Sequence, residues 1–255
     1  MSYSEIKNSF PSTDKNVMVV LSGGLDSSTV TIMLCEHYGA ERVNAISFDY
    51  GQKQKIELQK AAELTSKLNV KHQILDLSIL GKIARPFSAN IAGTDISMPT
   101  IKDVLADPQP KTYVPNRNMI MYSIVAAAAE VAGAELVYCG VQSTDAYGYW
   151  DTTTEWVNRM NSVFSLNRKS PVTLLAPFST LSKYEEILIC KELGALDLLK
   201  YTLTCYNPNE KGESCGECPS CAERIAAFAR AGVVDPVPYA IEIDWEKLFF
   251  GFSNV

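Results

Sequence analysis

A short stretch rich in glycine and serine, Ser22-Gly-Gly-Leu-Asp-Ser27, separates an apolar run from a segment of helical periodicity. The two glycines let the backbone approach an anion closely, and the N–H groups at the start of the following helix would face that anion. Ser22, Ser27 and Ser28 add hydroxyl donors, and Asp26 fits such a site if Mg²⁺ bridges it to phosphates. An isolated Gly-Gly equally fits a serine-capped turn, but a strand, this loop and a helix in that order favour a phosphate loop. The patterns GxxxxGKS/T and GxGxxG are absent from the sequence, which disfavours a Walker-type ATPase and a Rossmann dehydrogenase.

The C-terminal part of the chain holds a second group of residues that could do chemistry. These are four cysteines with the spacing C-x9-C-x2-C-x2-C: Cys205, Cys215, Cys218 and Cys221. Four thiolates with no open position are the ligand set of a structural Zn²⁺ site. A redox CxxC pair, an iron–sulfur cluster and a sulfur relay in catalysis are the alternatives. Zinc is favoured because no CxxC stands here between the strand and the helix of a βαβ unit. Cys35, Cys139 and Cys190 lie in apolar segments and are predicted to be buried small hydrophobes.

The elements that position these groups follow from hydrophobic periodicity. Strands are expected over 17–21, 43–48, 72–75, 136–140 and 172–175, and helices over 28–38, 54–68, 118–132, 154–164 and 183–193. Strands that alternate with helices predict an α/β fold with a parallel sheet and helices on both of its faces. The phosphate loop then lies at the carboxyl end of the first strand.

The chain divides into three parts by pattern. Residues 1–16 are a polar lead-in, residues 17–200 are predicted to form the ATP-binding α/β domain, and residues 201–255 form a small zinc-binding region. Within the domain, residues 78–115 carry several prolines and no long periodic segment, so an irregular insertion is expected there. A loop of this length in a compact domain is usually functional or mobile.

Composition narrows the class of function. The 255 residues are 47% hydrophobic and 20% charged, with a net charge of −6 from 23 basic and 29 acidic residues. An acidic chain is a poor match for a nucleic-acid backbone, so small-molecule chemistry is favoured and nucleic acid is not expected as the direct substrate. No apolar run is long enough for a membrane span, and the first residues do not resemble a secretory signal. We therefore expect a cytoplasmic protein with reduced thiols.

The loop at 22–27 resembles the SGGxDS signature of the PP-loop ATP pyrophosphatases. The resemblance implies a Rossmann-like fold of the adenine nucleotide alpha hydrolase type. It also implies that ATP, with Mg²⁺, is cleaved between its α- and β-phosphates and that AMP passes to a substrate oxygen. The residues expected around ATP are Leu21, Ser22, Gly23, Gly24, Leu25, Asp26, Ser27, Ser28, Phe48, Asp49, Tyr50 and Gly51.

Further motifs narrow the resemblance to the 7-cyano-7-deazaguanine synthases. In chain order they are SGGLDS (22–27), FDYGQ (48–52), YVPNRN (113–118), a GV…D…GY stretch (140–149), the segment 181–186, and TLTCYN followed by CGECPSC. Each motif alone is weak, whereas their order and joint presence are specific. The resemblance implies that ATP and ammonia convert 7-carboxy-7-deazaguanine to an amide, and that a second adenylation leads to the nitrile. It implies a homodimer as well, and free ammonia is the expected nitrogen source because the sequence has no glutaminase-like extension.

Roles for individual residues follow from the resemblance together with their chemistry. Arg117 is expected to clamp a phosphate or carboxylate, or to be a solvated arginine at a helix start. Lys183 is expected to neutralise phosphate charge, or to lie on a helix surface. Asp145 would accept hydrogen bonds from the N–H groups of a guanine-like ring, or cap a loop. The aromatic residues 147, 149 and 150 would stack on a purine or lie in the core. The expected catalytic residues are Ser22, Asp26, Ser27, Lys183 and Arg117, and the expected substrate contacts are Arg117, Asp145, Tyr149 and Asp151.

One segment departs from the family pattern of proline, aspartate, cysteine and arginine after Gly148-Tyr149. This chain has Trp150-Asp151-Thr152-Thr153 instead. The loss of an arginine is either harmless or alters the second adenylation. The alternatives therefore include an enzyme that stops at the 7-amido product or passes the activated deazaguanine to another acceptor. A tRNA-thiolating PP-loop enzyme is disfavoured by the acidic charge, and a non-enzymatic zinc-ribbon module is disfavoured by the intact SGGLDS loop.

Overall fold

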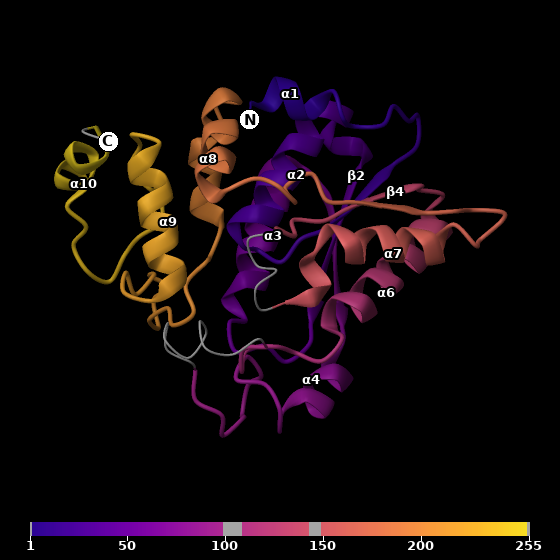
Figure 1. Ribbon diagram of the computed structural model, residues 1–255, viewed down its shortest axis with the longest axis horizontal. Helices are drawn as coiled ribbons and strands as arrows, with labels where there is room; N and C mark the ends of the chain where they lie inside the picture. Colours follow the sequence, from indigo (N-terminus) through magenta and orange to yellow (C-terminus); the bar gives the residue numbers. More distant parts are fainter. Residues whose placement is uncertain (1, 99–108, 143–148, 254–255) are drawn as a thin grey trace.

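The computed structural model describes residues 2–98, 109–142 and 149–253, which form a five-stranded parallel sheet with helices on both faces (Figure 1). The strands are β1 (Val17–Val20), β2 (Val43–Asp49), β3 (Lys71–Asp76), β4 (Leu136–Tyr138) and β5 (Thr173–Leu175). They lie in the order β3-β2-β1-β4-β5, and each neighbouring pair is parallel. The predicted α/β class and parallel sheet are confirmed.

The side chains of β1 and the residue after it alternate between two core layers. Val17, Val19 and Leu21 belong to one layer and are at most 1% exposed, whereas Met18 belongs to the other. Because successive side chains of a strand point to opposite faces, a strand that is apolar at every position is covered on both sides. This is the situation of β1 at the centre of the sheet.

Helices cover both faces of the sheet. The α-helices in the described part of the chain are α1 (Tyr3–Lys7), α2 (Leu25–Tyr38), α3 (Ile56–Leu68), α4 (Ser78–Ala84), α6 (Arg117–Ala132), α7 (Thr154–Phe164), α8 (Lys183–Glu192), α9 (Pro219–Arg230) and α10 (Trp245–Ser253). Apolar residues of α2, α3 and α8 pack against one face, and those of α6 and α7 pack against the other (Figure 1).

The direction of the strand order reverses between β1 and β4. From β1 the chain builds outward through β2 to β3, then crosses to the other side of β1 to add β4 and β5. In open parallel sheets the crevice at such a switch point, outside the carboxyl ends of the strands, is where ligands bind. The phosphate loop follows β1 at this point, and residues 140–142 follow β4.

The C-terminal helices extend the domain on the side of α8. In Figure 1, α8, α9 and α10 follow one another away from the sheet, and an apolar cluster joins α2, α8 and α9. Phe228 of α9 is fully buried in this cluster. The C-terminal region therefore packs directly on the α/β domain.

Some elements differ from those expected. The five predicted strands are confirmed to within about two residues, but α2 begins at Leu25 and not at Ser28. The lead-in contains α1, and α4 occupies the start of the segment that we expected to be irregular. Helices α9 and α10 were not expected. Within the described residues, no helix has both the length and the apolar character required to cross a membrane.

Candidate active site

The phosphate loop motif, residues 22–27, joins β1 to α2: residues 21–24 connect the two elements, and residues 25–27 form the first turn of α2. Gly24 is the N-cap residue of α2, and no described side chain caps this helix, so its first N–H groups are available to an anion. Ser27 Oγ accepts a hydrogen bond from the N–H of Ser22 (3.1 Å), and Ser22 Oγ accepts one from the N–H of Gly24 (3.2 Å). The two hydroxyl oxygens lie 3.0 Å apart. These bonds hold the loop tightly around the start of the helix.

Two glycines allow neighbouring elements to approach this loop. Gly23 has a φ of +91°, and a Cβ atom at this position would lie 2.1 Å from the carbonyl oxygen of Glu57 in α3. A Cβ atom at Gly140, after β4, would lie 2.6 Å from the backbone nitrogen of Ser27. Both distances are far inside van der Waals contact. The loop is thus enclosed by the start of α3 on one side and the exit of β4 on the other.

A cavity of about 430 Å³ opens at the carboxyl edge of the sheet, beside this loop. Its volume is in the range of small-molecule pockets. Eight of the predicted site residues line it: Leu21, Ser22, Asp26, Ser27, Phe48, Tyr50, Arg117 and Tyr149. The structure thus brings these eight residues together at one cavity, and their roles stay predictions.

Other predicted residues lie outside the cavity wall. They are Gly23, Gly24, Leu25, Ser28, Asp49, Gly51, Asp151 and Lys183. Ser28 is fully buried within α2, so its hydroxyl is no donor at the cavity surface. Asp145 and its neighbour Tyr147 lie outside the described residues.

Arg117 is the first residue of α6, lines the cavity and contacts Tyr50, the residue that follows β2. Its Nη1 donates to the hydroxyl of Tyr50 (3.3 Å), and its Nε donates to Asn118 Oδ1 (3.3 Å). Asp151, only 2% exposed, lies behind it and accepts a hydrogen bond from the N–H of Asn118 (3.4 Å). Burial raises the pKa of Asp151, and the nearby Arg117 lowers it. Asp151 therefore supports the start of α6 and does not itself line the cavity.

The segment that departs from the family pattern has local structural roles. The Trp150 indole donates to the hydroxyl of Tyr113 (3.0 Å). Thr153 is the N-cap of α7, and its hydroxyl accepts from the N–H of Trp156 (3.1 Å). Thr152 is buried and lines the cavity. The residues at 150 and 153 thus anchor the turn that leads into α7.

A buried polar cluster lies next to Asp26. Lys183, the first residue of α8, is 8% exposed, and its Nζ lies 3.6 Å from Asp26 Oδ1 and 3.2 Å from Glu223 Oε2. The same Nζ donates to Gln142 Oε1 (3.3 Å), and the Gln142 amide donates to Glu186 Oε1. Lys183 is therefore buried beside Asp26 and does not lie on a helix surface, and its role in neutralising phosphate charge stays a prediction. Sequence reasoning missed Gln142 and Glu186.

Asp26 and Glu186 form a pair of neighbouring carboxyl groups. As ionised acceptors, Asp26 Oδ1 and Glu186 Oε2 have no hydrogen-bond donor among the described residues. Burial and the adjacent Asp26 raise the pKa of Glu186 well above its ordinary value. The carboxylate of Asp26, beside the phosphate loop, is an oxygen ligand of the type that Mg²⁺ prefers. Asp26 fits the predicted role of a magnesium ligand.

Several cavity-wall residues were not assigned by sequence reasoning. They include Gln52, Gln54, Glu57, Asn90, Asn118 and Tyr206. Gln52 and Asn118 lie inside the motifs FDYGQ and YVPNRN, so the sequence motifs could have indicated them. Glu57 carried no such signal because an acidic residue near a helix start is ordinary.

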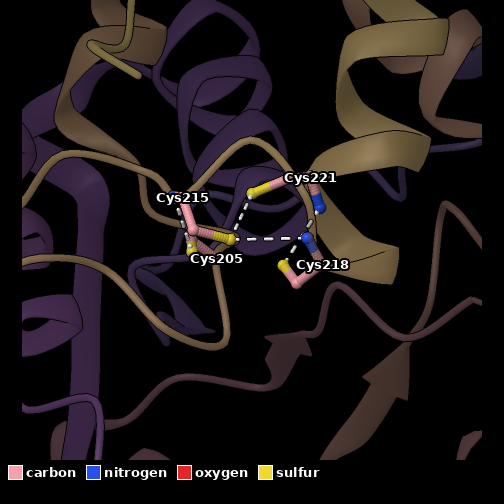
Figure 2. Close-up of side chains that lie close together, drawn as sticks. All are labelled: Cys205, Cys215, Cys218 and Cys221. Atoms are coloured by element: carbon pink, nitrogen blue, oxygen red, sulfur yellow. Dashed lines mark hydrogen bonds between the residues drawn. The ribbon is translucent and has the colours of Figure 1, made fainter. Parts of the chain in front are cut away.

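The four cysteines of the C-terminal region come together as predicted. Their sulfur atoms all lie within 4.8 Å of one another, and Figure 2 shows them gathered between a loop and the start of α9. Sulfurs around a tetrahedral Zn²⁺ lie about 3.8 Å apart, and the Cys215 and Cys221 sulfurs are separated by 3.9 Å. Backbone N–H groups donate to the sulfurs of Cys205, Cys215 and Cys218, which stabilises thiolates. The arrangement fits a four-coordinate metal site.

The cysteine segment also reaches the active-site cavity. The N–H of Leu203 donates to the carbonyl oxygen of Gly23 in the phosphate loop (2.9 Å). Tyr206 and Pro219, each beside a cysteine of the cluster, line the cavity. The amide of Gln54 donates to the carbonyl oxygen of Tyr206 (2.9 Å). A metal bound by the cysteines would therefore hold part of the cavity wall.

Comparisons with known proteins show which proteins this chain is similar to. A family model described as "Queuosine biosynthesis protein QueC" matches residues 16–232. The 7-cyano-7-deazaguanine synthase of Chromobacterium violaceum is 36% identical over 228 residues, covering 88% of this chain and 94% of the relative. That of Chromohalobacter salexigens is 40% identical over 233 residues, covering 90% of this chain and 88% of the relative.

Among solved structures, the chain is similar to the U34-tRNA thiolase NcsA from Methanococcus maripaludis, solved with its [4Fe-4S] cluster. The identity is 15%, the TM-score is 0.47, and the match covers 76% of this chain and 62% of the thiolase.

Proposed function

The chain belongs to the QueC family of 7-cyano-7-deazaguanine synthases, and we propose that it converts 7-carboxy-7-deazaguanine and ammonia to 7-cyano-7-deazaguanine with two molecules of ATP. The observation that carries this proposal is the extent of the family match. It runs over residues 16–232 and so includes the phosphate loop, Arg117 and all four cysteines of the cluster. The cavity at the switch point of the sheet supplies one site in which both substrates can meet.

The first part of the reaction activates a carboxylate. A carboxylate oxygen of the substrate attacks the α-phosphorus of ATP, an O–P bond forms, and pyrophosphate leaves. Ser22, Ser27 and the N–H groups at the start of α2 bind the phosphates, and Lys183 offsets the charge on them through its position beside Asp26. Ammonia then attacks the acyl carbon, the C–O bond breaks, and AMP and the amide result.

The second part activates the amide. The amide oxygen attacks the α-phosphorus of a second ATP, and loss of AMP with both N–H protons leaves the carbon–nitrogen triple bond. Arg117, held by Tyr50 and Asn118, lies across the cavity from the phosphate loop, where its guanidinium can bind a carboxylate or a phosphate. Phe48 and Tyr50, at the end of β2, are proposed to contact adenine, and Tyr149 the deazaguanine.

Two metals are proposed. Zn²⁺ would be held by the four cysteines and would stabilise the fold there, and Mg²⁺ would be bound near Asp26 with ATP, where it supplies positive charge to the phosphates. We further propose free ammonia as the nitrogen donor, a cytoplasmic location and a homodimer. The resemblance supports the donor and the dimer.

A single experiment tests the overall reaction. The purified protein is incubated with ATP, Mg²⁺, ammonium and 7-carboxy-7-deazaguanine, and the products are identified by mass spectrometry. The proposal predicts the nitrile together with AMP and pyrophosphate, two of each per nitrile. Accumulation of the amide as the end product would instead establish the alternative in which the enzyme stops after the first adenylation.

A further inference from the structure

Glu57 belongs to the wall of the cavity directly beside the phosphate loop. It is the second residue of α3, and its backbone approaches Gly23 so closely that a Cβ atom there would lie 2.1 Å from the Glu57 carbonyl oxygen. Among the described residues, no hydrogen bond to its carboxyl oxygens is formed, so the group is not committed to holding the fold.

The surroundings of Glu57 suit a group that gains and loses a proton. The other titratable residues of the cavity wall are Asp26, Tyr50, Arg117, Tyr122, Tyr149 and Tyr206. Burial raises the pKa of Glu57 to about 8, although the positive charge of Arg117 lowers it. Asp26 is engaged with Lys183, and neither histidine of the chain lines the cavity. Glu57 is therefore the carboxyl group of this wall that remains available as a base.

The reaction proposed above requires such a base. When ammonia attacks the acyl adenylate, the new C–N bond leaves a proton to be removed from nitrogen. When the amide oxygen bonds to the α-phosphorus, a first N–H proton must leave to give the imidate ester of AMP. When the C–O bond of that ester breaks, AMP departs with the electron pair and the second N–H proton must leave as the nitrile forms.

We propose that the Glu57 carboxylate is the general base that removes the protons from the substrate nitrogen. The proposal rests on the proposed function, because it assigns the proton acceptor of that reaction. In each step the carboxylate takes one proton and returns it to solvent through the cavity opening before the next step. Activation of the carboxylate itself involves no N–H proton, so Glu57 has no proton to accept in that step.

A structural role for Glu57 has different consequences. An acidic residue in the first turn of a helix stabilises that helix by interaction with its dipole. Loss of such an effect would lower the stability and would weaken all steps alike. A base, in contrast, changes only the steps that release a nitrogen proton and changes their dependence on pH.

The test compares two half-reactions in Glu57→Gln. Carboxylate activation is measured as exchange of labelled pyrophosphate into ATP with 7-carboxy-7-deazaguanine and no ammonia. Nitrile formation is measured from the 7-amido compound and ATP, which removes the titration of ammonium from the pH profile. Glu63→Gln is the matched control, because it makes the same change on the same helix at a carboxylate that pairs with Lys60 outside the cavity wall.

We expect Glu57→Gln to slow nitrile formation by about a hundredfold or more, in line with general-base contributions, and to slow pyrophosphate exchange by less than about tenfold. For wild type, the rate of nitrile formation should rise with pH up to about 8 and then level off, since only the ionised carboxylate accepts a proton. This rise should be absent in Glu57→Gln and present in Glu63→Gln.

Nitrile formation by Glu57→Gln within about threefold of wild type would overturn the proposal, as would an equal loss in both half-reactions. If the glutamine variant does not fold, the pH profile of the wild type decides, because a flat profile between pH 6 and 9 would exclude this base. Failure of the wild-type protein to convert either compound would instead overturn the proposed function, and the role of Glu57 with it.

Discussion

A substitution at Asp26 should reduce the activity of the protein while leaving its folding stability nearly unchanged. Its side chain is 25% exposed beside the loop, while its partner Lys183 keeps a second carboxylate, Glu223, at 3.2 Å. Removing the Asp26 carboxylate therefore takes away the proposed Mg²⁺ ligand and leaves the lysine with a carboxylate partner.

We predict that Asp26→Ala reduces ATP-dependent pyrophosphate release by about a hundredfold or more, the scale of loss when one electrostatic group of an active site is removed. The melting temperature of the protein, monitored by circular dichroism, should change little. Glu155→Ala, which removes an exposed carboxylate of α7, serves as the control and should retain full activity. Pyrophosphate release near the wild-type rate in well-folded Asp26→Ala would exclude the loop assignment.

Gly23 permits a second prediction at the level of one residue. Gly23→Ala places a Cβ atom against the Glu57 backbone and forces a positive φ on alanine, so it should displace the loop from α3. Gly133→Ala has a similar φ of +69° but open space around the Cβ position, and it measures the backbone strain alone. We expect about 1–2 kcal/mol of destabilisation in Gly133→Ala with normal ATP affinity. Gly23→Ala should be destabilised more than Gly133→Ala, and its ATP affinity, measured by calorimetry, should fall at least tenfold. Equal stability and equal ATP affinity in the two variants would contradict the close packing of Gly23 against Glu57.

At the scale of elements, Thr153, which stands where the family pattern has an arginine, stabilises the start of α7. Because its hydroxyl caps the helix, Thr153→Ala should destabilise the protein by about 1 kcal/mol in urea unfolding. Thr153→Ser retains a capping hydroxyl and should remain near wild type. Neither variant should change the product from nitrile to amide. A shift to the amide in Thr153→Ala alone would show that this residue acts on the second adenylation.

The elements show what sequence patterns can and cannot predict. The strands were predictable because β-branched apolar runs covered on both faces leave a clear pattern. The start of α2 was not, because its first turn, Leu25-Asp-Ser-Ser28, reads as loop and its N-cap glycine gives no side-chain signal. Helix α4 has only seven residues and contains Gly81, which approaches the carbonyl oxygen of Tyr50 so closely that a Cβ atom would lie 2.1 Å away. Tertiary packing, and not local preference, fixes that helix.

The site was predictable to the extent that its residues belong to continuous motifs. The phosphate loop and the cysteine cluster are local in sequence, so their spacing predicts their geometry. Glu57 lies outside the quoted motifs. Gln142 and Glu186 lie inside two of them, at 140–149 and 181–186, but their contacts with Lys183, with each other and with Asp26 form only in the folded chain. Burial raises the pKa of Glu57 and of Glu186, and burial cannot be inferred from one sequence position.

At the scale of the whole molecule, the cysteine cluster and the cavity should respond together. Cys215→Ser, or removal of the metal by a chelator, is predicted to lower the melting temperature and to weaken ATP binding, since the segment that begins at Leu203 bonds to Gly23. Metal analysis should give about one Zn²⁺ per chain in wild type. Cys35→Ser, at a cysteine outside the cluster, is the control and should leave both properties near wild type. Iron in place of zinc, or full ATP affinity in the metal-free protein, would contradict this prediction.

The hydrogen bond between Leu203 and Gly23 also bears on how the protein is made. A ribosome releases the phosphate loop well before Leu203, which bonds to it, and before Tyr206 and Pro219, which line the cavity. A nascent chain that has not reached Leu203 can form the first strands while it still lacks part of the cavity wall. With ATP bound in the cavity as proposed, a chain that includes these residues should resist proteases better than a fragment that ends before Leu203.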